Sequence, residues 1–123
     1  MDFNLTEEQL LIRKTAQDFA NDHLRPGVIA RDENSEFPLD QIKMMGEIGF
    51  MGMMIPEENG GAGMDSLSYC LAMEEIAKAD ASAAVIMSVN NSLVCQLLHK
   101  YGNKDQKKQY LVKLASGKWL GAF

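Results

Sequence analysis

Two adjacent carboxylates, Glu74 and Glu75, are the first candidates for chemistry, because paired acidic side chains can serve as a general acid and a general base. They lie in residues 67–78, where apolar residues recur at helical spacing. Adjacent residues point about 100° apart around a helix, so the two carboxylates cannot share one substrate proton. We therefore expect at least one of them to face solvent or a basic partner.

The cysteines and histidines form no ligand or nucleophile pattern. Cys70 and Cys95 are far apart, form no C-x-x-C motif and sit among apolar residues, which predicts two buried free thiols. His23 and His99 lie near helix ends and are expected to be capping or surface residues. The glycine-rich residues 56–63 match neither phosphate-binding motif, so we interpret them as a rigid joint between helical layers. No metal site is predicted.

The longest nearly apolar stretch is residues 81–98, from Ala81 to Leu98. Four small polar residues within it fall on one face of a helix: Ser88, Asn91, Ser92 and Cys95. Apolar side chains cover most of the remaining surface, as is typical of a buried helix. An unpaired buried amide costs about 1–3 kcal/mol, so these polar groups must be bonded or used. Two interpretations stay open: a satisfied core helix, or a polar face that lines a cavity.

Length and charge restrict the class of protein. A chain of 123 residues, 46% hydrophobic and 24% charged, is expected to form one globular domain. The net charge of −5 argues against nucleic acid and anionic membranes as partners. The first residues have neither a basic segment nor an apolar core, and Asn90 and Asn91 would be costly in a bilayer. We expect a soluble, cytoplasmic protein.

Capping and breaking residues divide the chain into five or six helices packed around residues 81–98, an all-α fold. A capping box joins Thr6 to Gln9, and five methionines between residues 44 and 54 are expected to fill the core. Residues 50–55 could be a short extended segment or a buried loop. The remaining boundaries are set by Pro26-Gly27, Pro38, Gly49, Asp65 or Ser66, Asp80 or Ser82, the Asn103–Gln106 box and Gly117.

The alternating aromatic pattern of residues 118–123 predicts the start of a β-strand. We therefore divide the chain into a helical domain, residues 1–117, and the beginning of a β-domain, residues 118–123.

Several strings in the right order resemble the acyl-CoA dehydrogenase family over the whole chain. Residues 55–63 read IPEENGGAG, Tyr69 follows, and residues 73–77 read MEEIA. Residues 85–93 read VIMSVNNSL, which is similar to the short-chain (butyryl-CoA) branch, and residues 101–108 read YGNKDQKK. The resemblance is to the N-terminal helical domain of such an enzyme.

The resemblance implies a place for the central stretch. In that family FAD lies between a middle β-domain and a C-terminal helical bundle, and the N-terminal domain helps to close the acyl pocket. By this resemblance, residues 85–92 line the pocket floor, and Phe123 stands at the first flavin-contacting strand. The candidate substrate-pocket residues are Val85, Ser88, Val89, Asn91 and Ser92, and the candidate cofactor-binding residue is Phe123.

The resemblance also implies what this stretch of chain lacks. The catalytic glutamate and most flavin contacts lie downstream of Phe123 in the family, so none of residues 1–123 is a catalytic candidate and the chain alone is expected to be inactive. The implied partners are a short-chain acyl-CoA such as butyryl-CoA and the electron-transferring flavoprotein, in a homotetramer acting in fatty acid metabolism. The alternatives are a stand-alone helical interaction module and an acyl-CoA oxidase-like flavoenzyme of the same fold.

Overall fold

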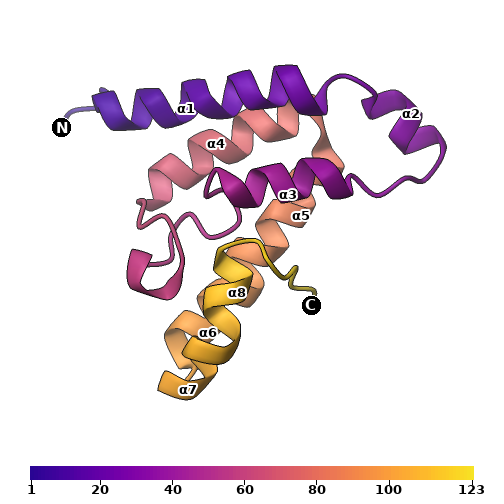
Figure 1. Cartoon of the computed structure of the whole chain (residues 1–123). Coiled ribbons are helices and arrows are strands. Elements are labelled where there is room, and N and C mark those ends of the chain that lie inside the picture. The colour runs from indigo at the N-terminus through magenta and orange to yellow at the C-terminus, as the bar shows by residue number, and fades with distance from the viewer.

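The computed structural model describes residues 1–123 and contains helices but no strands (Figure 1). The all-α prediction, with five or six helices, is confirmed. Helix α1 (Glu7–Phe19) continues into a π-helical turn (Ala20–Leu24), and it is followed by α2 (Val28–Glu33), α3 (Leu39–Glu47), a 3-10 turn (Glu57–Asn59) and α4 (Ser66–Ala79). The central helix joins α5 (Ala81–Ser88), a π-helical segment (Val89–Cys95) and α6 (Gln96–Tyr101); the last helix joins α7 (Lys104–Gln106), a π-helical turn (Lys107–Leu111) and α8 (Val112–Ala115).

The helices are arranged in two groups that share the central helix. Helices α1 and α4 lie side by side, and α3 lies close to them (Figure 1). The central helix starts beside α4 and runs away from that group, and the last helix packs along its second half (Figure 1). The central helix therefore contacts both groups, which makes it the element that holds the domain together.

Side-chain caps define the helix starts as the sequence indicated. Thr6 and Gln9 form a reciprocal capping box, and so do Asn103 and Gln106. Where two caps were possible, the structure uses aspartate each time. Asp65 accepts a hydrogen bond from the Ser68 N–H, and Asp80 accepts one from the Ala83 N–H at 3.0 Å.

Two clusters of buried apolar residues make the core. The larger one lies between α1, α3, α4 and α5, and the smaller one lies between the central helix and the last helix. Of the five methionines expected in the core, Met45, Met51 and Met53 are fully buried and confirm the prediction, whereas Met44 and Met54 are half-buried. Residues 50–55 form a buried loop rather than an extended segment.

The strand expected at residues 118–123 does not form, and that prediction is wrong for this structure. A strand exists through its ladder of bonds to a neighbouring strand, and none of residues 1–123 forms a strand beside this segment. The segment is instead a coil that returns to the helices through the Trp119 and Gly121 N–H groups. The division into domains at residue 117 stays a prediction.

The central helix, Ala81–Tyr101, is the one helix whose length and composition would suit a membrane span. The core helix of a globular domain meets the same criterion. Asn90 and Asn91, in the middle of this helix, are at most 1% exposed and bond to neighbouring segments of the domain. The position of this helix is therefore that of a core element.

Candidate functional site

The polar face of the central helix is saturated with hydrogen bonds inside the domain. The Asn91 amide donates to the carbonyls of Phe50 at 2.8 Å and Met87 at 2.9 Å. Its Oδ1 accepts from the Met53 N–H at 2.8 Å. Both N–H groups and the Oδ1 atom of the side chain are thus bonded, and two of the three partners lie in the buried loop that follows α3. Asn91 fastens this loop to the central helix.

The preceding residue, Asn90, fastens two further segments. Its Nδ2 donates to the Met51 carbonyl at 2.7 Å and to the Leu114 carbonyl at 3.1 Å, and its Oδ1 accepts from the Gly121 N–H at 2.8 Å. Asn90 was not among the sequence-based candidates. The available signal was a second amide beside Asn91 in a helix that is otherwise apolar, because two adjacent buried amides need two sets of partners.

The helix is π-helical where these two asparagines lie. The Gln96 N–H donates to the Asn91 carbonyl five residues earlier, which is the bond that defines this geometry. The wider turn accompanies the burial of consecutive side chains, with Asn90 on the side of α8 and Asn91 on the side of the loop after α3. Local sequence rules for α-helices do not anticipate such a segment.

The five candidate pocket residues do not share one free surface. Asn91 is 1% exposed and lies in the core, whereas Val85 is 61% exposed on the opposite side. Ser88, Val89 and Ser92 are half-buried between them, and the Ser92 hydroxyl donates to the Ser88 carbonyl at 2.7 Å. The polar face could belong to a satisfied core helix or line a cavity. The asparagines agree with the satisfied core helix, because their amides are bonded inside the domain.

The free surface of the central helix is apolar. Val85, Val89, Leu93 and Leu97 recur every four residues and form what we call the outward ridge. Val85, Leu93 and Leu97 are each 45% exposed or more, and Val89 is half-buried. The ridge carries no ionisable side chain. It can bind an apolar chain or an apolar protein surface, but it cannot transfer a proton.

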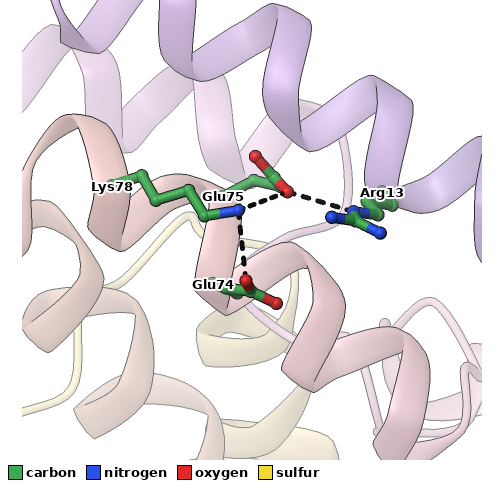
Figure 2. Close-up of polar contacts among 4 residues, drawn as sticks. All are labelled: Arg13, Glu74, Glu75 and Lys78. Carbon is green, nitrogen blue, oxygen red and sulfur yellow. Dashed lines mark hydrogen bonds and ion pairs between the residues drawn. The ribbon is translucent and has the colours of Figure 1, made fainter.

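The paired carboxylates are engaged in ion pairs, as predicted (Figure 2). Glu75 is 4% exposed and accepts from Lys78 Nζ at 2.9 Å and from Arg13 Nε at 3.1 Å, across the contact between α4 and α1. Glu74 lies at the surface and pairs with the same lysine. The hydrogen bond from Lys78, with that from Arg13, lowers the pKa of Glu75. Such a carboxylate is a poor proton acceptor.

The two thiols differ, and the prediction is right for only one of them. Cys95 is fully buried, and burial raises the pKa of its thiol to about 12. Cys70 is exposed, because α4 turns Ser68, Leu71 and Glu75 inward and leaves Cys70 on the other face. No group of three or more histidine, cysteine, aspartate or glutamate side chains could hold a metal ion.

The histidines are partly as expected. His23 is exposed and its ring lies against that of Phe19, with the ring centres 5.2 Å apart. His99 is half-buried near the end of the central helix, and its Nδ1 has no hydrogen-bond partner. Neither histidine has a nucleophile or a carboxylate as a hydrogen-bond partner.

A surface cavity lies between α2 and the start of α5, and its lining includes Ser82 and Ile86 but none of the five candidate pocket residues. Its wall holds Asp32, Glu33 and Glu36. It also holds an ion pair in which Arg31 Nη2 donates to Asp80 Oδ2 at 3.0 Å. This ion pair ties α2 to the start of the central helix, which gives Arg31 and Asp80 a structural role.

The glycine-rich loop, residues 56–63, packs tightly against its neighbours. A Cβ at Gly60 would lie 2.8 Å from the Val112 carbonyl oxygen, and one at Gly61 would lie 2.0 Å from that of Ile55. These glycines are needed for close packing within the loop and against the last helix, as a rigid joint requires. Phe123, the candidate cofactor contact, is 95% exposed and bonds to nothing.

Comparison with known proteins places this arrangement in one family. The family model described as acyl-CoA dehydrogenase, N-terminal domain, matches residues 6–118. The short-chain specific acyl-CoA dehydrogenase of Clostridium acetobutylicum is 43% identical over 123 residues, which is 100% of this chain and 32% of that protein.

Solved structures agree. Butyryl-CoA dehydrogenase from Megasphaera elsdenii superposes with a TM-score of 0.90 and 38% identity, covering 98% of this chain and 32% of that one. A chain in the structure described as the electron transferring flavoprotein of Acidaminococcus fermentans superposes with a TM-score of 0.94 and 42% identity. The match covers 98% of this chain and 32% of that one. The chain thus spans about a third of the length of these relatives, and it belongs to the acyl-CoA dehydrogenase family as a match to the N-terminal domain.

Proposed function

We propose that this chain is the N-terminal domain of an FAD-dependent short-chain acyl-CoA dehydrogenase, which introduces an α,β double bond into a short acyl-CoA such as butyryl-CoA. The observation that carries the proposal is the 43% identity, over the whole chain, to a short-chain specific enzyme. The similarity to the butyryl-CoA dehydrogenase structure supports the same substrate class. In such an enzyme the bound flavin supplies the acceptor for the hydride from the β-carbon.

The part played by this chain is that of a pocket wall. The outward ridge offers Val85 and Val89 to the acyl chain, since an alkyl group gains free energy from apolar contact alone. Ser88 and Ser92 border this stretch of the ridge, and their small side chains leave room beside the helix for the acyl chain. Asn91 contributes indirectly from the buried side of the helix. Its bonds to the loop after α3 fix the position of the helical turn that carries Val89.

The chemistry itself is assigned to the part of the enzyme outside these residues. Glu75, the only deeply buried glutamate of the pair, is neutralised by Lys78 and Arg13 and lies on α4, not on the central helix. The other two thirds of the enzyme must then supply the base that removes the α-proton. They must also supply the flavin contacts other than that of Phe123. The 123-residue chain alone is expected to be inactive.

The same proposal extends to the partners of the enzyme. The electron acceptor is taken to be an electron-transferring flavoprotein; the naming of such a protein for a similar structure supports this choice. The family resemblance supports a homotetramer and a role in fatty acid metabolism. A cytoplasmic location is part of the same proposal, and fractionation of cells that express the full-length protein would test it.

The test compares the 123-residue chain with the same chain extended to the full length of its relatives. Both proteins are purified, their visible spectra are recorded for bound flavin, and dye reduction is measured with butyryl-CoA and with longer acyl-CoAs. We expect a yellow protein with butyryl-CoA turnover only for the extended chain.

Two results would contradict the proposal. Flavin binding and turnover by the 123-residue chain would refute its role as a wall without catalytic groups. No turnover of any acyl-CoA by the flavin-loaded extended protein would refute the assignment as a dehydrogenase; hydrogen peroxide production with substrate would identify an oxidase of the same fold instead.

A further inference from the structure

Residues 119–123 are fastened to the helices although they have no secondary structure of their own. The Trp119 N–H donates to the Lys113 carbonyl at 3.0 Å, and the Lys113 ammonium lies 4.2 Å from the centre of the indole ring. Two residues later, the Gly121 N–H donates to Asn90 Oδ1 at 2.8 Å. The segment is therefore held at one end by the last helix and in its middle by the central helix.

Contact with Val94 explains the glycine at position 121. Its backbone is not in the left-handed region, so conformational freedom is not the reason for glycine there. A Cβ at this position would lie 2.7 Å from Cγ1 of Val94 and 2.9 Å from both Cβ and Cγ2. Valine in a helix has one strongly preferred rotamer and cannot turn away easily. The segment thus lies directly on the central helix, one turn after Asn90.

The Asn90 side chain suits this position because it needs both its donor and its acceptor. The NH₂ group donates to the carbonyls of Met51 and Leu114, while Oδ1 is left to accept from Gly121. An aspartate would lose both donated bonds, and a leucine would lose all three. We call Asn90, Val94 and Gly121 the latch.

We propose that Asn90 is a positioning residue that, through the latch, sets the distance between the acyl-pocket wall and the segment that leaves the domain. The ridge residue Val89 directly precedes Asn90, so one turn of helix carries both the wall and the latch. This inference rests on the proposed function, in which the flavin contacts begin at Phe123 and continue beyond it. A released latch then leaves the wall intact but misplaces the reacting groups, and small misplacements slow a reaction strongly.

The test breaks the latch at Gly121, because Asn90→Ala removes core bonds and could prevent folding. Gly121→Ala places a methyl group on Val94, and Val94→Ala in the same chain removes two of the three close atoms. Ala122→Gly, at the next and exposed residue, is the matched control. In the 123-residue chain we measure hydrogen exchange of the amide at position 121 and the fluorescence of Trp119, the single tryptophan.

We expect Gly121→Ala to speed exchange of that amide about tenfold, which corresponds to the loss of one hydrogen bond, and to change the Trp119 spectrum. The double variant should recover part of the protection, because Cβ of residue 94 stays 2.9 Å from the added methyl group, and Ala122→Gly should change neither signal. Unchanged protection in Gly121→Ala would refute the latch. So would an equal loss of protection in Ala122→Gly.

Kinetics of the flavin-loaded, full-length protein then test positioning. We expect Gly121→Ala to lower kcat for butyryl-CoA about tenfold with KM within about twofold, and the double variant to recover kcat. An open latch with unchanged kcat would refute the positioning role. If the unmutated enzyme oxidises no acyl-CoA, the proposed function fails, and amide exchange still decides whether the latch holds the segment.

Discussion

The central helix has two faces that contrast in chemistry and in use. Its inward face carries Asn90, Asn91 and the Cys95 thiol, all at most 1% exposed, and the two amides are saturated with hydrogen bonds. Its outward face carries Val85 and Leu97, both more than half exposed and without polar partners. Buried polar groups of this kind specify one arrangement of neighbouring segments, whereas an exposed apolar ridge is a surface for recognition.

The adjacent glutamates on α4 repeat the contrast on a smaller scale. Glu75 faces inward and is bonded to two cations, while Glu74 faces outward and shares only the exposed Lys78 (Figure 2). In both cases the side chain that suggests chemistry in the sequence holds the structure together. The function proposed for the molecule is carried by side chains that the sequence presents as ordinary apolar residues.

The largest expected effect is on the inward face, from Asn91→Ala. The substitution leaves a buried N–H at Met53 and buried carbonyls at Phe50 and Met87 without this partner. We expect a loss of about 4 kcal/mol in the free energy of unfolding, measured with denaturant. Ser92→Ala, which removes only a bond within the helix, is the control and should cost less than about 1 kcal/mol. Equal losses would remove the distinction between the faces.

The start of the central helix gives the next effect. Asp80→Ala removes the cap on the Ala83 N–H and leaves the nearly buried Arg31 guanidinium with backbone carbonyls but without its carboxylate partner. We expect a loss of about 3 kcal/mol in unfolding free energy. Asp80→Asn retains an oxygen for the cap and loses the ion pair, so its cost should fall between that of the alanine variant and zero. A full loss in Asp80→Asn would mean that the ion pair alone matters.

Much of the fold could be predicted because its signals are local. The capping boxes at Thr6 and Asn103, the stop at Gly49 and the helical spacing of apolar residues each depend on a few neighbouring residues. The buried role of methionine also followed from its clustering, since Met45, Met51 and Met53 are all in the core.

The candidate site was harder to predict because faces are assigned by contacts between distant segments. Nothing near Asn91 in sequence announces that Phe50 and Met53 will be its partners, and Asn90 meets Gly121 only through the return of the chain after α8. Cys70 was placed in the core for the same reason: its apolar neighbours were visible, but the direction of the α4 interior was not. The π-helical turn further changed which side chains of the central helix lie together.

The two glutamates provide a smaller effect that depends on pH. The pKa of Glu75 is lowered in the folded chain, chiefly by the hydrogen bond from Lys78. The ionised carboxylate is therefore more stable in the folded chain than in the unfolded chain. Its stabilisation is present above the unfolded value of 4.5 and is lost as the pH falls through the lower folded value. We expect Glu75→Gln to cost about 1 kcal/mol at pH 7 and to flatten the acid limb of stability against pH.

The control is Glu74→Gln, at the exposed neighbour, which should leave the acid limb unchanged and cost at most a few tenths of a kcal/mol. Asp65, whose pKa is also lowered, mainly by its bond from the Ser68 N–H, still supplies part of the acid limb in both variants. If Glu74→Gln changed the acid limb of stability against pH more than Glu75→Gln does, the assignment of inward and outward carboxylates would be reversed.

The smallest effect on stability, and the sharpest test of the outward face, is Val85→Ala. Val85 is 61% exposed, so its truncation should change the free energy of unfolding by less than about 0.5 kcal/mol. In the full-length enzyme the same change should raise KM for butyryl-CoA severalfold, because the acyl chain loses apolar contact.

Leu97→Ala is the matched control on the same ridge. It lies twelve residues along the helix, or about 18 Å away, which is farther than a butyryl group reaches. A larger rise in KM for Leu97→Ala than for Val85→Ala would move the pocket wall to the other end of the ridge, and a large loss of stability in Val85→Ala would make this face structural as well.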